Sequence, residues 1–253
     1  MPTSIKEISG GLWRVFKEKN PEYHYILGVD TASGKEGANE SSCCVLGIED
    51  GEQYSTCSGL IDPQRMTAEV EKAGRYYKDK EGLEAILAIE KEFHGASLLA
   101  NLRDTYRNLY YHEDTLTGFG QGIREFGWDA RRFRQTAIDW LQRDIGYSNS
   151  VNKKDKEQGL FVHDPDTINQ LGYFVRNKKT GKYEAAAGKY DDRVSSLYIA
   201  NFVRCQRRHL YLKSSEPPKP EGKTYNEMLF DDLEQDERRV RLDEDSDFSM
   251  RER

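Results

Sequence analysis

Two apolar stretches that each end in an acidic residue constrain the fold of this chain more than any other feature of its sequence. Residues 23–30 read YHYILGVD and residues 84–90 read EAILAIE. Apolar runs of this kind are typical of strands that are buried on both faces of a sheet. We therefore predict two adjacent parallel strands, whose final residues, Asp30 and Glu90, lie at the same edge of the sheet.

The order of the other elements predicts the fold class. We expect strands at 42–48, 53–61 and 108–111, helices at 63–80, 95–106, 129–145, 164–175 and 191–212, and a hairpin with its turn at 177–182 and its second arm at 183–187. Three antiparallel strands are thus followed by parallel strands that alternate with helices. This order predicts an α/β fold of the ribonuclease-H-like class, a mixed five-stranded sheet with helices on both faces.

Charge divides the 253 residues into a neutral body and an acidic tail. Of the 44 acidic and 38 basic residues, 13 and 7 lie in 214–253, which leaves 31 of each for the rest of the chain. The tail follows a proline-rich linker, and we expect it to be flexible. We predict a lead-in at 1–22, one domain at 23–213, and this tail.

No stretch is long and apolar enough for a membrane helix or a secretion signal, so we expect a cytoplasmic protein without a membrane partner.

Four carboxylates are placed by this topology where they could converge. Asp30 and Glu90 end neighbouring strands, and the consecutive pair Asp191 and Asp192 begins the last long helix. Carboxylates that crowd together repel each other, so a cation is needed to offset their charge. Oxygen ligands without a histidine or thiolate cluster favour Mg²⁺ or Mn²⁺. One or two such ions could activate water for the hydrolysis of a phosphodiester.

Short motifs around these acids resemble the nuclease domain of bacteriophage terminase large subunits, over roughly residues 23–203. The motifs are GVDTASG at 28–34, AIE at 88–90 with His94 and Gly95 after it, GKYDDRV at 188–194, Gly181 and Lys182, Gly127 and Trp128 with Arg134 six residues later, and Tyr76 and Tyr77. They occur in the order that the family shows and at plausible spacings.

This resemblance implies a metal-dependent endonuclease that cuts concatemers of double-stranded viral DNA during genome packaging. Carried over by position, Asp30, Glu90 and Asp192 are catalytic metal ligands, and Asp191 is an additional one. The chain departs from the family at two positions: Tyr190 stands where a histidine is frequent, and Glu92 stands where an asparagine is common.

The resemblance also implies partners. Terminase large subunits carry a packaging ATPase and act with a portal and a small terminase subunit, in the cytoplasm of the host cell. No G-x-x-x-x-G-K-[ST] phosphate loop occurs in this sequence, so we expect an isolated nuclease domain without motor activity.

Basic residues near the acids are candidates for contact with DNA phosphates. They are Arg124, Arg131, Arg132, Arg134, Lys178, Lys179 and Lys182. His94 and Tyr190 are further candidates for the pocket. No motif that reads bases is present, so we expect binding that weakens with salt and has little sequence specificity.

Other functions remain open at this stage. A Holliday-junction resolvase or a ribonuclease-H-type nuclease would use the same acids. A module that binds DNA or docks on the portal, with weak cleavage, would suit the acidic tail. A sugar-kinase-like ATPase would need a second duplicated domain, for which the chain is too short. We also expect the 174–187 hairpin to control access to the acids.

Overall fold

The computed structural model describes residues 3–4, 12–37, 39–114, 123–178 and 180–211. The expected acidic tail at 214–253 and Lys179 lie outside these residues.

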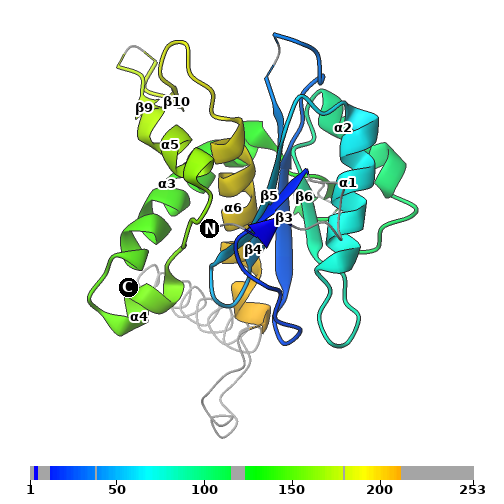
Figure 1. The fold of residues 1–253 in the computed structure, drawn as a ribbon, viewed down its shortest axis with the longest axis horizontal. Helices are drawn as coiled ribbons and strands as arrows, with labels where there is room; N and C mark the ends of the chain where they lie inside the picture. The colour runs from blue at the N-terminus through cyan, green and yellow to red at the C-terminus, as the bar shows by residue number, and fades with distance from the viewer. Residues whose placement is uncertain (1–2, 5–11, 38, 115–122, 179, 212–253) are drawn as a thin grey trace, which may run out of the picture. The chain divides into compact units, whose positions relative to one another are not determined.

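Six strands form the central sheet, in the order β1-β2-β5-β4-β3-β6 (Figure 1). They are β1 (Thr3–Ser4), β2 (Trp13–Val15), β3 (Tyr25–Asp30), β4 (Ser41–Gly47), β5 (Gln53–Gly59) and β6 (Ile86–Ile89). Neighbouring strands are antiparallel except for β3 and β6, which are parallel. The mixed sheet and the parallel pairing of the two apolar stretches are therefore confirmed.

The edges of the sheet differ from the prediction. Residues 13–15, within the segment that we expected to precede the domain, pair with β5 as β2. At the opposite edge, the predicted strand 108–111 contributes only a parallel bridge between Leu87 and Leu109. Tyr111 instead begins β7 (Tyr111–Asp114), which pairs with β8 (Ile123–Phe126) in a separate two-stranded sheet.

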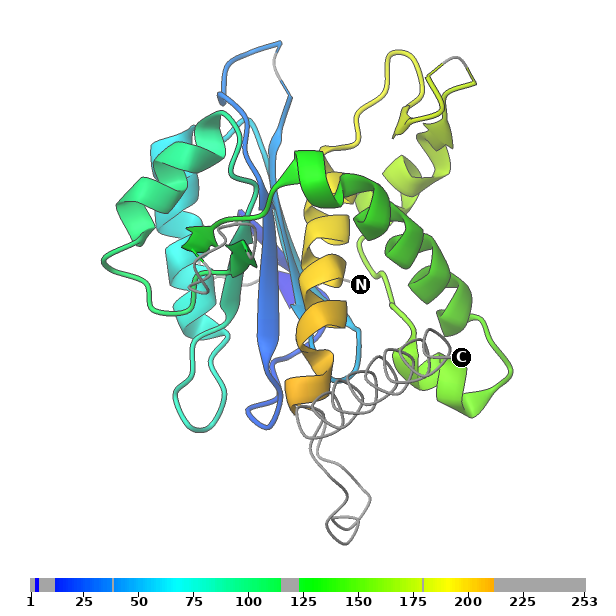
Figure 2. The same ribbon diagram turned by 180° about the vertical axis from the view of Figure 1, so that it is seen from behind.

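Helices cover both faces of the sheet, as predicted (Figures 1 and 2). On one face lie α1 (Pro63–Tyr76) and α2 (His94–Leu102), and on the other lie α3 (Ala130–Ser148) and α6 (Asp192–Tyr211). The sequence favours α1 locally, because Asp62 accepts a hydrogen bond from the Arg65 amide and Pro63 suits the first turn.

The elements between α3 and α6 are shorter. They are α4 (Lys153–Gln158), α5 (Pro165–Tyr173), β9 (Phe174–Arg176) and β10 (Tyr183–Ala185). Helix α4 is not among the predicted elements. The predicted helix at 164–175 ends earlier in the structure, because the residues from Phe174 already form the first arm of the hairpin.

Alternation along β3 and β6 divides the core into two layers. Leu27, Val29 and Ile89 pack with residues of α1 and α2. Ile26, Ile86 and Ala88 pack in the other layer with residues of α3 and α6. Successive side chains of a strand point to opposite faces, so Asp30 and Glu90 belong to the α6 side.

Gly28 allows α6 to approach the sheet closely. A Cβ atom at this position would lie 2.1 Å from the Ser196 carbonyl oxygen and 2.5 Å from the Ala200 amide nitrogen. Only a glycine therefore permits this contact. The contact brings the first turn of α6 beside the end of β3, where the predicted acids lie.

Among the described residues, no helix combines the length and the apolar character that crossing a membrane requires.

Candidate active site

Asp30 and Glu90 emerge together from the sheet. Val29 pairs with Ile89 in the parallel register of β3 and β6, and the Glu90 amide donates to the Val29 carbonyl at 3.0 Å. Since each acid follows a paired residue directly, the backbone sets both carboxyl groups at one point of the sheet edge, as the sequence predicts.

The paired aspartates reach this point from α6. Asp192 begins the helix and is only 4% exposed, and its Oδ2 accepts a hydrogen bond from the Glu40 amide at 3.2 Å. Asp191 precedes the helix, and its carbonyl accepts from the Ser195 amide at 2.8 Å. The N-terminal end of a helix favours negative charge, so this position suits both aspartates.

The carboxyl groups of Asp30 and Glu90 are electrostatically linked. Burial raises the pKa of Asp30 well above its ordinary value, and the charges of Glu90 and Asp191 add to this effect. Burial also raises the pKa of Glu90. Asp30 and Glu90 share a side-chain hydrogen bond, which favours the proton on Asp30 and opposes it on Glu90. Burial and the neighbouring Glu90 thus both favour the neutral form of the Asp30 carboxyl.

Asp192 belongs to the same electrostatic group. Burial raises the pKa of Asp192 to about 6, and the charges of Asp30 and Asp191 contribute to the rise. Within the described ranges, no three His, Cys, Asp or Glu side chains are arranged to hold a metal ion as they stand. The four carboxylates nevertheless act on one another through space. This donor set suits a hard divalent cation, which would offset the repulsion between them.

Arg134 is a positive charge at the cluster. Its Nη2 atom lies 3.6 Å from the Asp191 carboxylate and donates to the Tyr183 carbonyl at 3.3 Å. Its charge opposes the rise in the pKa of Glu90. The guanidinium also lies over the Tyr198 ring, 5.8 Å from the ring centroid. A residue predicted to contact DNA is thus placed beside the acids themselves.

The glycine–tryptophan segment runs alongside Glu90. The Trp128 amide donates to the Ile89 carbonyl, and the Lys91 amide donates to the Trp128 carbonyl. Gly127 has φ of 92°, and a Cβ there would lie 2.6 Å from Leu99. Trp128 is fully buried and packs in the core.

The remaining predicted pocket residues are peripheral. His94 is exposed at the start of α2, and Tyr190 is 58% exposed. Neither makes a hydrogen bond or ion pair with the four acids in the described part of the chain. Glu92, which stands where the resembled family often has an asparagine, forms an ion pair with Arg131, and its carboxylate lies 2.7 Å from Arg131 Nε.

Four of the predicted DNA contacts gather in one cavity. This cavity of about 400 Å³ lies between the first turns of α3 and the second arm of the hairpin, and its basic residues are Arg131, Arg132, Arg134 and Lys182. Arg124 lies elsewhere, over the Tyr111 ring at 4.7 Å from its centroid. Lys178 is exposed on the hairpin, and Lys179 lies outside the described residues.

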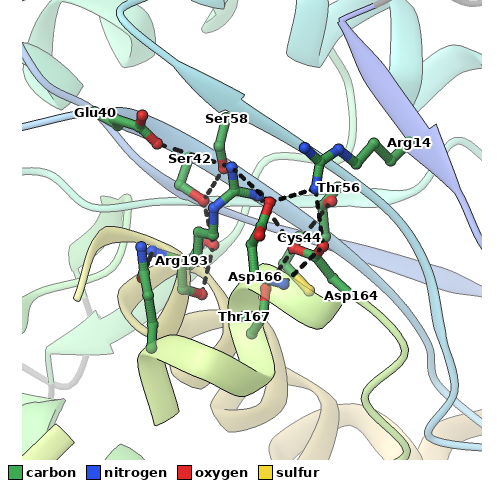
Figure 3. A network of polar contacts seen from close by, with 12 residues as sticks. Arg14, Glu40, Ser42, Cys44, Thr56, Ser58, Asp164, Asp166, Thr167 and Arg193 are labelled. Atoms are coloured by element: carbon green, nitrogen blue, oxygen red, sulfur yellow. Dashed lines mark hydrogen bonds and ion pairs between the residues drawn. The ribbon is translucent and has the colours of Figure 1, made fainter. Parts of the chain in front are cut away.

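A polar network around Arg193, the residue that follows Asp192 in the chain, was not predicted (Figure 3). Asp164 is completely buried and accepts hydrogen bonds from Arg193 at 3.1 Å and Thr167 at 2.8 Å. Arg14 of β2 also pairs with Asp164 and with Asp166. The network ties β2, α5 and the first turn of α6 together. The only local signal in the sequence is the position of Arg193 directly after the two aspartates.

No protein-family model matches this chain, and neither does any curated protein. Among solved structures, it is similar to the large terminase nuclease from thermophilic phage G20c with bound cobalt. The TM-score is 0.53 at 16% identity, over 77% of this chain and 88% of that chain. The same nuclease with bound magnesium gives equal values, and a further structure of it gives a TM-score of 0.50 at 15% identity, over 76% and 88%. The resemblance expected from the motifs is thus confirmed in the fold: this chain has the ribonuclease-H-like fold of a phage large terminase nuclease.

Proposed function

We propose that this protein is a divalent-metal-dependent endonuclease that cuts double-stranded viral DNA during genome packaging, with little sequence specificity. The observation that carries the proposal is the meeting of Asp30 and Glu90 with Asp191 and Asp192 at one end of the sheet. The fold adds support, since it is that of a nuclease solved with bound cobalt and with bound magnesium.

Asp30, Glu90 and Asp192 would hold one or two Mg²⁺ or Mn²⁺ ions, and Asp191 would contribute a further oxygen. When bound, the ions would polarise the scissile phosphate and favour the ionised form of a water molecule. The residues of this chain fix the geometry: the strand register holds Asp30 and Glu90 in place, and the Glu40 amide orients the Asp192 carboxylate.

The cavity beside the cluster would hold the DNA backbone. Arg131, Arg132 and Lys182 line it, and Arg134 joins it to Asp191. Such contacts position a phosphate without reading the bases. Because Arg134 also donates to the Tyr183 carbonyl, the 174–187 hairpin is linked to the acids, and we expect its removal to change the cutting rate.

In this role the protein would act in the host cell cytoplasm, together with a packaging ATPase domain, a portal and a small terminase subunit. The alternative function is that of a module that binds DNA or docks on the portal through its acidic tail and cleaves DNA only weakly.

Plasmid digestion tests the proposal. Nicking and linearisation are expected with Mn²⁺ or Mg²⁺ and not with EDTA, and both Asp30→Asn and Glu90→Gln should abolish them. Unchanged cutting by these two variants would contradict the mechanism. Preference for four-way junctions or for RNA–DNA hybrids over duplex DNA would instead favour a resolvase or a ribonuclease. DNA retention without cleavage under either metal would favour the binding module.

A further inference from the structure

A second basic cavity lies at the other end of α6, away from the acids. Its volume is about 580 Å³, and Tyr110, Tyr111, His112, Arg132, Phe133, Gln206 and Arg207 line it. Arg207 lies 15 residues after Asp192 on α6, which corresponds to about 22 Å along the helix. The Arg207 side of the cavity is thus remote from the proposed catalytic site.

His112 is the residue that points to a ligand. It is only 8% exposed, and its Nδ1 atom has no hydrogen-bond partner among the described residues. Its Nε2 atom lies 2.9 Å from a Glu125 carboxylate oxygen, and the ring packs edge-on against Phe133. A buried polar atom without a partner costs free energy. Because Nε2 lies beside a carboxylate, Nδ1 bonds to a phosphate oxygen as an N–H donor only when both ring nitrogens carry a proton.

Positive charge around the cavity restricts the kind of ligand. The Arg207 guanidinium lies 5.7 Å from the centroid of the Tyr111 ring, and Arg124 lies 4.7 Å from it. Arg207 makes no ion pair with a carboxylate in the described part of the chain. Arg132 supplies a further guanidinium to the lining. Arginines beside an imidazole form a donor set that suits a phosphate group, which accepts several hydrogen bonds and carries negative charge.

We propose that this cavity binds a phosphate group and that, given the proposed function, the group belongs to the backbone of DNA whose cleavage site lies at the acids. Arg132 supports this source, because it lines both this cavity and the basic cavity beside Asp191. Arg132 in the first turn of α3 therefore contributes to both cavities. The distance of about 22 Å along α6 between Asp192 and Arg207 corresponds to about 7 base pairs of duplex DNA.

Fluorescence anisotropy with labelled duplexes in EDTA tests the DNA source. Arg207→Gln is expected to weaken the binding of a 24-base-pair duplex about tenfold. It should also lower the slope of log K against log[salt] by about one. The difference from the wild type should be smaller for a stem of about 4 base pairs closed by a hairpin loop, because its duplex is too short to span the distance of about 22 Å. Arg207→Lys should recover part of the loss, and the matched control Arg65→Gln, an exposed arginine on the α1 face, should behave as the wild type.

Titration with inorganic phosphate tests the cavity independently of DNA. The imidazole NMR signals of His112, assigned with His112→Gln, should shift in the wild type and shift much less in Arg207→Gln. If His112 responds but Arg207→Gln binds the long duplex with wild-type affinity and salt slope, DNA is the wrong source and a free phosphate-bearing ligand is the right one. If neither response occurs, the proposal is overturned. A wild type that binds no DNA at all would contradict the proposed function, while the phosphate titration would still decide on the cavity.

Discussion

Asp30 lies beside Glu90 because Val29 pairs with Ile89 in a parallel register, and burial together with the charge of Glu90 raises the pKa of Asp30 well above its ordinary value. Two buried acids at one point of the sheet edge form a site that is unfavourable when both are ionised. The fold keeps them together in spite of this cost.

Asp30→Asn should stabilise the metal-free protein while abolishing cleavage. The amide keeps the size of the side chain and can still donate to Glu90, but it removes the free-energy cost of holding the buried carboxyl in its neutral form or of ionising it beside the other acids. We expect a higher melting temperature in EDTA, and a loss of the stabilisation that Mn²⁺ gives the wild type. A lower melting temperature of the variant in EDTA would show that the carboxyl is not under strain.

The stability of the metal-free protein should fall as the pH rises through 6. A carboxyl whose pKa is raised by folding stabilises the fold below the pKa of the unfolded chain, and the contribution is lost as the pH rises through the folded value. Burial raises the pKa of Asp192 to about 6. Melting temperatures in EDTA should therefore decrease between about pH 4 and pH 7. Asp192→Asn should reduce the decrease, and Mn²⁺ should stabilise the wild type more at pH 8 than at pH 5; equal effects at both values would argue against the cluster.

Gly28→Ala should destabilise the fold and displace α6. The added methyl group would lie 2.1 Å from the Ser196 carbonyl oxygen, which cannot yield without moving the helix that carries Asp192. Overpacking of this kind costs about 1–3 kcal/mol. Gly146→Ala is the matched control, since nothing lies within 4 Å of its added methyl group in α3; there a gain of about 0.5–1 kcal/mol is expected. Urea denaturation measures both, and equal behaviour of the two variants would contradict the close packing.

Arg193→Gln should weaken both the fold and the metal site. It leaves the buried Asp164 carboxylate without its arginine on α6, and the loss of a partner in a buried ion pair costs about 3 kcal/mol. Because Arg193 directly follows Asp192, we also expect a higher Mn²⁺ concentration for half-maximal cutting. Lys80→Gln, which removes an exposed pair with Glu22, should leave the urea midpoint close to that of the wild type. An equally unchanged midpoint for Arg193→Gln would show that the network is dispensable.

Phe93→Gly should leave the fold as stable as the wild type or make it more stable. Phe93 directly precedes α2, is 89% exposed and has φ of 48°, a conformation that costs a residue with a side chain about 1–3 kcal/mol. Glycine relieves this strain but loses about 0.5–1 kcal/mol through the greater freedom of the unfolded chain. The free energy of unfolding, measured in urea, should therefore stay equal or increase.

The control for this substitution is Val151→Gly. Val151 is also an exposed apolar residue, but its φ is not positive, so glycine relieves no strain there and should lower the stability slightly. A clear loss of stability in Phe93→Gly, equal to or larger than that of the control, would contradict the strain at this position.

The central strands could be predicted because their sequences carry the physical signal of their surroundings. The stretches that became β3 and β6 are apolar without interruption, which only a strand covered on both faces requires. β2 could not be predicted in the same way, since it has three residues and only Trp13 and Val15 are buried. Its place in the sheet depends on pairing with β5, a distant segment of the chain.

The acids of the candidate site also differ in how far local sequence predicts their position. Asp30 and Glu90 could be placed together from the sequence, because the ends of parallel neighbours coincide. The approach of Asp192 depends on the close packing of α6 on Gly28, and the partner of Arg193, Asp164, lies 29 residues earlier in the chain. Contacts of this kind leave no local pattern.

The position of Arg134 also depends on a contact between distant segments of the chain. The sequence predicts it as a DNA contact, but its place beside Asp191 follows from the packing of α3 near α6, which no local motif records.

The most direct test of the account is anomalous diffraction from crystals of the wild-type protein soaked in Mn²⁺. We predict an anomalous peak within about 2–2.6 Å of carboxylate oxygens from Asp30, Glu90 and Asp192. Manganese bound only at other positions, or no ordered manganese at a concentration that supports cutting, would contradict the claim that these acids form the metal site.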